Sequence, residues 1–186
     1  MKPRPRLLLA AVLLLVFSGP AMAAEDDTYD MGTILKKAET FFGGTTKGLA
    51  EVMQKTFKEH GWPNGYITGE EASGAFVVGL RYGRGKLNRK NGETRDIFWQ
   101  GPTVGFDIGG NASKVFTLIY HMSKTDELYQ RIPGVDGSLY IAAGFGVNYQ
   151  QTGELILAPI RTGVGLRLGV NVGYLHYGKK QTWIPF

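Results

Sequence analysis

The chain has 186 residues, a formal net charge of +5, 27 glycines and no cysteine, which excludes disulfide bonds, thiol catalysis and thiolate metal sites. Residues 1–23 carry three basic residues and no acidic one, so without them the net charge is only +2, too mild to indicate nucleic-acid binding. Glycine is about twice as frequent as its average usage of about 7%. Because the glycines are spread among apolar and aromatic residues, they indicate many short strands and tight turns.

The first 23 residues have the pattern of a secretory signal peptide. Lys2, Arg4 and Arg6 form a basic start, residues 7–17 are continuously apolar, and Ala21-Met22-Ala23 supplies the small residues that signal peptidase recognises. The apolar run is shorter than the roughly 20 residues that a membrane-spanning helix needs. We therefore expect cleavage after Ala23, export to the periplasm and a mature chain that forms one domain.

The mature chain is predicted to begin with a disordered lead, residues 24–30, followed by two amphipathic helices near residues 31–42 and 46–60. Apolar residues recur at helical spacing in both helical segments. Gly43-Gly44 separates the two helices, and Thr45 or Thr46 is the predicted cap of the second. We expect these helices to cover a sheet or to close the mouth of a barrel.

From residue 65 onward the hydrophobic period changes from helical to alternating or fully apolar. Strands are predicted at residues 66–68, 74–82, 85–89, 95–99, 103–108, 113–120, 138–147, 154–160 and 163–177. Asn91-Gly92 predicts a hairpin, because both residues tolerate a positive φ. One helical turn is predicted after Ser123, which is its expected cap, and Pro133-Gly134 ends that turn.

The fold class that follows is mainly β, or α+β by content. Residues 31–186 are predicted to form a small antiparallel β-barrel with peripheral N-terminal helices and one short inserted helix. Residues 115–120 and 155–160 are apolar on both faces, so their strands need cover on both sides, which the N-terminal helices can supply.

The ionisable residues form no recognisable catalytic or metal-binding pattern. His60, His121 and His176 lack paired spacing, and Glu70-Glu71 is predicted to lie in a solvated turn. In an extended segment these two adjacent carboxylates would point to opposite faces and would make a poor acid–base pair. The sequence therefore predicts that the protein is not an enzyme and that it uses neither a cofactor nor a metal.

Seven residues are the candidate lining of a ligand cavity inside the barrel. They are Phe76, Val78, Phe106, Asp107, Phe145, Leu166 and Leu168. Asp107 interrupts an apolar strand, and it fits either an outward-facing or turn-capping role or a polar contact at the lip of an apolar cavity. The bulky aromatic members are equally compatible with an interior that is filled by packed side chains.

Several segments resemble the EipA-type envelope integrity proteins, an alphaproteobacterial family of unknown function. They are Asn64-Gly-Tyr-Ile-Thr-Gly-Glu-Glu71, Ser73-Gly-Ala-Phe-Val-Val-Gly-Leu-Arg-Tyr-Gly83, Phe98-Trp-Gln-Gly-Pro102, Tyr129-Gln-Arg-Ile-Pro-Gly-Val-Asp-Gly137, Pro159-Ile-Arg-Thr-Gly-Val-Gly165 and Gly169-Val-Asn-Val-Gly-Tyr174. The resemblance implies a periplasmic β-barrel with an apolar interior, a role in envelope integrity and a suspected lipid ligand. Residues 105–113 are similar to the glycine-rich core of the SYLF lipid-binding domains.

The leading hypothesis is a periplasmic, non-enzymatic protein that supports the cell envelope by binding a lipid or another hydrophobic small molecule in its barrel. Peripheral association with envelope membranes is expected, and nucleic acid is not. Two alternatives stay open. One is an integral outer-membrane β-barrel, which the length and the terminal Phe186 favour. The other is a structural or protein-interaction module with a side-chain-filled core. The sequence does not indicate the oligomeric state.

Overall fold

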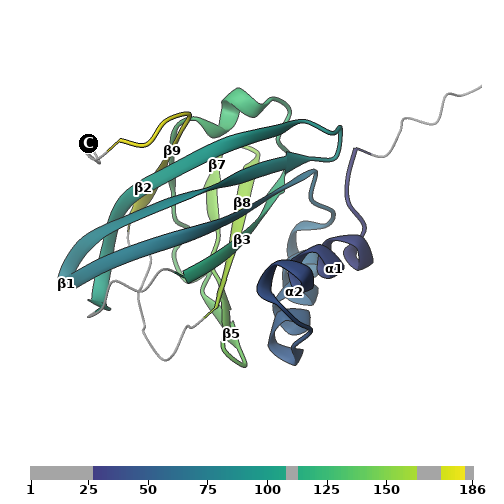
Figure 1. Cartoon of the computed structure of the whole chain (residues 1–186), viewed down its shortest axis with the longest axis horizontal. Helices are drawn as coiled ribbons and strands as arrows, with labels where there is room; N and C mark the ends of the chain where they lie inside the picture. Colours follow the sequence, from purple (N-terminus) through teal and green to yellow (C-terminus); the bar gives the residue numbers. More distant parts are fainter. Residues whose placement is uncertain (1–26, 108–112, 163–172, 183–186) are drawn as a thin grey trace, which may run out of the picture.

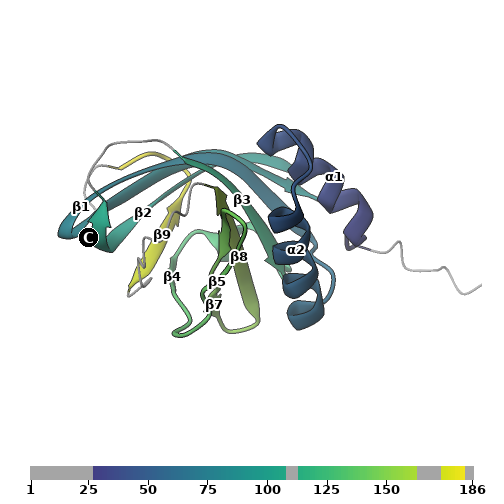
Figure 2. The ribbon, with the colours of Figure 1, turned by 90° about the horizontal axis from the view of Figure 1, so that it is seen from below.

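The computed structural model describes residues 27–107, 113–162 and 173–182, with the side chains of residues 73–78 and 103–107 left out. One antiparallel sheet dominates it, with strand order β4-β9-β2-β1-β3-β8-β6-β5 and with β7 also paired to β8. The strands are β1 (Gly65–Arg89), β2 (Thr94–Asp107), β3 (Ser113–Tyr120), β4 (Arg131–Pro133), β5 (Tyr140–Ala142), β6 (Phe145–Val147), β7 (Gln150–Thr152), β8 (Leu155–Thr162) and β9 (Tyr174–Gly178). The sheet curls into an arch, and the helices lie along one side of it (Figures 1 and 2). The predicted mainly β, barrel-like fold is therefore confirmed.

Two capped helices, α1 (Met31–Phe42) and α2 (Lys47–His60), precede the sheet. The Asp30 side chain accepts a hydrogen bond from the Thr33 backbone N–H at 2.8 Å, and the Thr46 hydroxyl accepts one from Leu49 at 3.2 Å. Both contacts satisfy amide donors that the first turn of a helix leaves without a partner. The structure thus selects Thr46 from the two predicted capping residues.

β1 is continuous in its backbone but doubles back on itself between Gly69 and Gly85. In a straight strand these residues would lie roughly 50 Å apart. However, a Cβ atom placed on Gly69 would lie 2.4 Å from the carbonyl oxygen of Arg84, and one placed on Gly85 would lie 2.4 Å from that of Thr68. The two halves therefore touch at a pair of glycines, where any side chain would collide with the opposite backbone.

Because of this reversal, the two halves of β1 pair with different strands of the sheet. The first half of β1, residues 65–71, pairs with β3, and residues 75–88 pair with β2. The sequence predicts three short strands here, at residues 66–68, 74–82 and 85–89, and the structure joins them into one element. The predicted hairpin after it is confirmed, because Asn88 at the end of β1 pairs with Thr94 at the start of β2, and Gly92 between them has a φ of 87°.

The two ends of the curled sheet meet beyond β4. β4 pairs with β9, and Gly134, immediately after β4, forms a β-bridge with Gln150 of β7. The backbone N–H of Val135 also donates to the carbonyl of Tyr149 at 2.9 Å. Because β7 pairs with β8, these contacts join the two sides of the arch and give the sheet its barrel-like form.

Each face of the curled sheet has its own apolar core. The helix-side core joins both helices to the outer face of β3 and β8 and includes Ile34, Ala38, Leu49, Val52, Met53, Phe116, Leu118, Tyr120, Ala158 and Ile160. The inner core fills the concave side and includes Ile67, Leu87, Ile97, Trp99, Val115, Ile119, Met122, Leu128, Ile132, Leu155, Leu157, Leu175 and Tyr177. The predicted need for cover on both faces of residues 115–120 and 155–160 is thus met.

The predicted strand over residues 138–147 is wrong. β5 and β6 instead form a tight hairpin in which Tyr140 pairs with Val147 and Ala142 with Phe145. The two loop residues, Ala143 and Gly144, have φ values of 39° and 87°. Positive φ at both positions is the geometry of two-residue hairpins that match the twist of the strands. An alanine at the first position gives no sequence signal for such a turn.

Two other predicted elements differ in detail. The helical turn is a 3-10 helix, Thr125–Leu128, and Glu127 supplies its cap, because its carboxylate accepts hydrogen bonds from the backbone of Ser123 and Lys124. Of the predicted strand 163–177, residues 174–177 lie in β9, whereas residues 163–172 lie outside the described residues.

Within the described ranges, no helix combines the length and the apolar character that crossing a membrane requires.

The contact between Trp99 and the glycines of β1 is testable by substitution. A Cβ atom on Gly83 would lie 2.0 Å from the Trp99 ring, whereas one on Gly44, between the helices, would meet nothing within 4 Å. We expect Gly83→Ala to lower the free energy of unfolding by about 1–3 kcal/mol, as overpacking does. Gly44→Ala should change it by less than about 0.5 kcal/mol. Urea unfolding of both variants measures the difference, and equal stabilities would contradict the packing described here.

Candidate functional site

The two adjacent carboxylates Glu70 and Glu71 lie on opposite faces of β1. Neither is in a turn, so the predicted solvated turn is wrong, because the chain continues through this point as a strand. Alternation along the strand, however, separates the two side chains as expected. Glu70 is exposed on the outer face, while Glu71 is only 4% exposed inside the curled sheet.

Glu71 is held by two arginines and one indole. Arg161 of β8 donates from Nε to Oε1 at 2.8 Å and from Nη2 to Oε2 at 3.2 Å, a two-point contact that suits a planar guanidinium. The Nε1 atom of Trp99 in β2 donates to Oε2 at 3.0 Å. The Nε atom of Arg81, in the second half of β1, lies 3.4 Å from Oε1. One carboxylate therefore links β1, β2 and β8.

The surroundings of Glu71 keep it ionised. Burial alone would raise the pKa of its carboxyl, but the charges of Arg161 and Arg81 and the hydrogen bonds from Arg161 and Trp99 hold that pKa at about 2. Burial likewise works against the charge of Arg161, and the carboxylate of Glu71 outweighs it, so the pKa of Arg161 is raised. The pair is consequently charged over the whole physiological pH range.

Two amide side chains and a phenol extend this arrangement. Arg161 Nη1 donates to Asn148 Oδ1 at 2.6 Å, and the hydroxyl of Tyr177 donates to Gln150 Oε1 at 2.8 Å. The rings of Tyr177 and Trp99 lie 6.2 Å apart, and burial raises the pKa of the Tyr177 phenol. We name this set the polar layer; it consists of Glu71, Arg81, Trp99, Asn148, Gln150, Arg161 and Tyr177.

The polar layer is continuous with the inner core and lies at one limit of it. Trp99 and Tyr177 belong to both, and on one side of them lie fully buried apolar residues such as Leu87 and Ile97. On the other side the paired strands continue, because β1 and β2 remain in register from Leu80 opposite Pro102 to the end of β2. Among the described side chains, the layer therefore lies between the packed apolar residues of the inner core and the far end of the paired strands β1 and β2.

Of the seven predicted cavity residues, the structure describes the side chain of Phe145 alone. Phe145 belongs to the helix-side core, where its ring lies 5.1 Å from that of Phe42, and so it does not face the inner core. Phe76 and Phe106 are paired across β1 and β2, and Val78 and Asp107 lie in the same two strands. The side chains of these four fall outside the described set, and Leu166 and Leu168 lie outside the described residues altogether.

The members of the polar layer were missed by the sequence analysis, although a signal was present. Glu71 lies in a glycine-rich extended segment, and Arg161 directly follows the apolar run 155–160. A charged residue in a strand that is apolar on both faces must be paired when it is buried. What the sequence lacks is the pairing itself, because the two residues are ninety positions apart.

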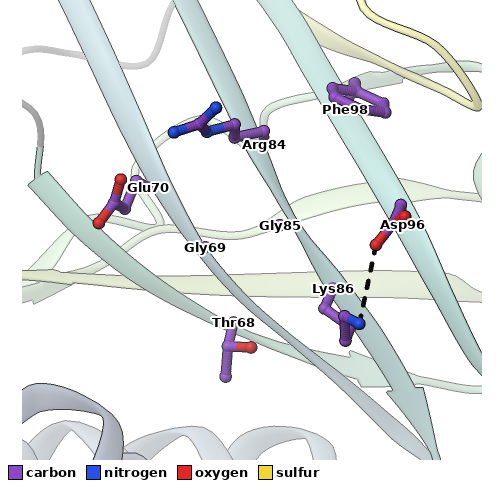
Figure 3. A pocket seen from close by; sticks show the side chains of 8 residues that line it. All are labelled: Thr68, Gly69, Glu70, Arg84, Gly85, Lys86, Asp96 and Phe98. Atoms are coloured by element: carbon purple, nitrogen blue, oxygen red, sulfur yellow. Dashed lines mark ion pairs between the residues drawn. The ribbon is translucent and has the colours of Figure 1, made fainter.

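The outer face of the same strands carries a shallow groove of about 420 Å³ (Figure 3). Its lining residues are Thr68, Gly69, Glu70, Arg84, Gly85, Lys86, Asp96 and Phe98. Lys86 Nζ lies 3.9 Å from Asp96 Oδ1, and both of these side chains are more than half exposed. Gly69 and Gly85 contribute only backbone to this groove, because a Cβ atom on either would point to the inner face, towards Trp99 or Ile67.

A second polar cluster lies under the end of α2. The Tyr149 hydroxyl donates to Glu59, which is also paired with Lys55, and the His60 ring packs edge-on against Tyr149 with ring centres 4.3 Å apart. Burial lowers the pKa of His60, so this histidine is favoured in its neutral form.

Within the described residues, no group of three or more histidine, aspartate or glutamate side chains is arranged to hold a metal ion.

The pKa of Glu71 predicts a loss of stability in acid. Because the folded-state pKa of about 2 lies below the ordinary value of 4.5, the ionised carboxylate stabilises the fold above pH 4.5. This contribution, about 3 kcal/mol, is lost as the pH falls from 4.5 towards 2. Urea unfolding at pH 7 and pH 3 measures the loss.

Two glutamine variants make this measurement specific. Glu71→Gln should lower the free energy of unfolding at pH 7 by about 3–5 kcal/mol, because it leaves buried arginine charge without its partner. Its stability should also fall less between pH 7 and pH 3 than that of the unaltered protein. Glu70→Gln, the same change on the exposed face, should have almost no effect at pH 7. A Glu71→Gln variant as stable as Glu70→Gln would contradict the role assigned to this carboxylate.

Comparisons with known proteins agree with this architecture. The sequence matches the family described as Envelope integrity protein A over residues 27–186. It is similar to a solved structure described as a beta-barrel-like, uncharacterised protein from Brucella abortus, with 47% identity and a TM-score of 0.78 over 86% of this chain and 99% of that chain. The comparison with curated proteins finds no match. The match over residues 27–186 includes the whole described sheet and both helices, and the chain therefore belongs to the envelope integrity protein A family.

Proposed function

We propose that this protein is a periplasmic, non-enzymatic protein that supports envelope integrity by binding a lipid or another hydrophobic molecule at the far end of its curled sheet. The observation that carries the proposal is a buried, charged polar layer on the concave side of a sheet whose strand pairing continues beyond it. Among the described side chains, the inner core reaches this layer, and the pairing of β1 with β2 continues from Leu80 opposite Pro102 to Ala75 opposite Asp107. A curled sheet of this size encloses either packed side chains or one small ligand.

The polar layer suits binding better than catalysis. A general acid or base works best when its pKa lies near the working pH, and Glu71, with a pKa of about 2, lies far from neutrality. Arg161 and Trp99 engage both carboxylate oxygens. A ligand site needs a mostly apolar wall and a few fixed polar groups, and the buried, ion-paired polar layer provides such groups.

The periplasmic location is supported by the family and by the first residues of the sequence. Membership of an envelope integrity family associates the chain with the cell envelope. The basic start, the apolar run 7–17 and Ala21-Met22-Ala23 favour export and cleavage after Ala23. Peripheral contact with envelope membranes belongs to the same proposal.

Expression of the whole chain in a bacterial host tests the location. We expect the accumulated protein to begin at Ala24, as read by N-terminal sequencing, and to be released by osmotic shock followed by a salt or carbonate wash. Replacing Ala21 and Ala23 by bulky residues should leave the leader attached, because the peptidase needs small side chains at these positions. Protein that only detergent extracts would contradict the proposal and favour the outer-membrane barrel.

Native mass spectrometry tests ligand binding directly. Protein purified from cells without detergent should carry a hydrophobic molecule that adds a discrete mass and that organic extraction releases. Extracted protein should regain that mass when the extract is returned to it. A protein that carries nothing from cells, and takes up nothing afterwards, would favour the side-chain-filled module instead.

A further inference from the structure

Two buried amides occupy neighbouring inward positions where the chain passes from β6 to β7. Asn148 is 7% exposed and Gln150 is fully buried. The residues that alternate with them, Val147 and Tyr149, belong to the helix-side core. Asn148 and Gln150 instead contact Arg161 and Tyr177 on the concave side, as strand alternation requires.

The orientation of the Asn148 amide is fixed by its neighbour. Arginine can only donate hydrogen bonds, so the atom of Asn148 that faces Arg161 Nη1 at 2.6 Å must be the oxygen. Gln150 is oriented in the same sense, with its oxygen accepting from the Tyr177 hydroxyl at 2.8 Å. Each amide therefore presents its NH₂ group away from these partners.

Neither NH₂ group has a hydrogen-bond partner among the described residues. Asn148 Nδ2 and Gln150 Nε2 are both buried and unpaired. A dry, unpaired donor is unfavourable inside a protein, and most buried polar groups have a partner. Two such donors, two residues apart in the polar layer, are hydrogen-bonding capacity that an acceptor from another molecule would satisfy.

The chemistry of the polar layer limits the kind of group that this acceptor can be. Both amide oxygens are already engaged, and so are both oxygens of Glu71. The atoms of the two amides that have no partner are therefore both donors, and a matching group must offer acceptors. Glu71 is ion-paired to Arg81 and Arg161, which offsets its repulsion of a second anion.

We infer that the polar layer binds the carboxylate of a long-chain fatty acid, with Asn148 Nδ2 and Gln150 Nε2 as its hydrogen-bond donors. The inference rests on the proposed function, because the acyl chain would lie in the far end of the sheet described there. It adds a head-group class and an orientation, with the carboxylate inward against the packed core and the hydrocarbon pointing away from it.

The test compares two ligands with the same chain. Palmitate and methyl palmitate are titrated into delipidated mature protein loaded with the neutral fluorescent probe N-phenyl-1-naphthylamine, and displacement of the probe gives their affinities. We expect palmitate to bind at least about tenfold more tightly, because charged hydrogen bonds are the stronger ones. Equal affinities would overturn the inference and leave hydrophobe binding intact, whereas failure of both ligands to bind would overturn the proposed function as well.

Matched variants test the two donors. Asn148→Asp and Gln150→Glu keep the oxygen that faces Arg161 or Tyr177 and replace the NH₂ group by a second oxygen. Each should weaken palmitate binding at least about tenfold and leave methyl palmitate within about threefold. Gln151→Glu, the same change at an exposed neighbour, should alter neither affinity. Circular dichroism confirms folding, and a preference for palmitate that survives in both inward variants would overturn the inference.

Discussion

A carboxylate stays ionised inside a protein only where opposite charge and hydrogen bonds replace the water that it has lost. For Glu71 those groups come from three strands, because Arg81, Trp99 and Arg161 lie in the second half of β1, in β2 and in β8. In the sheet β1 and β8 are both neighbours of β3, so Glu71 and Arg161 meet across that strand on the concave face. Backbone pairing joins only adjacent strands, whereas this cluster joins β8 to β1 across β3 and also includes β2, and so it helps to hold the curvature on which the remaining structure depends.

The same interior explains why glycines crowd into the middle of β1. Trp99 reaches Glu71 only by lying against the backbone of Gly83 and Gly69, where a Cβ atom would fall 2.0 Å and 2.7 Å from its ring. Gly69 also touches Gly85, in the other half of β1. The backbone at this point is therefore covered by the Trp99 indole on the inner face and lines the groove on the outer face. The space that side chains would occupy at these glycines is thus filled by one large aromatic residue of the adjacent strand, Trp99 of β2.

The elements that the sequence predicted well depend on local signals. Thr46 begins α2, Asn91-Gly92 makes a hairpin, and residues 115–120 are buried on both faces, and each feature follows from a few neighbouring residues. The elements that were wrong depend on distant contacts. The partner of Glu71 is ninety residues away, and the hairpin at Ala143 contains a residue that rarely adopts a positive φ. Phe145 was assigned to the cavity because a bulky apolar residue fits either face of a sheet equally well.

The break between β6 and β7 shows how the two faces of the sheet are coupled. Gln150 pairs with Leu157 of β8 and is bridged to Gly134, so this short segment carries the contact that joins the ends of the arch. On its helix side, Tyr149 packs against His60 and donates to Glu59 of α2. On its inner side, Asn148 and Gln150 hold Arg161 and Tyr177 in the polar layer. A shift of α2 against the sheet would move the residues between these contacts, and any molecule bound at the layer would in turn stabilise one position of the helix.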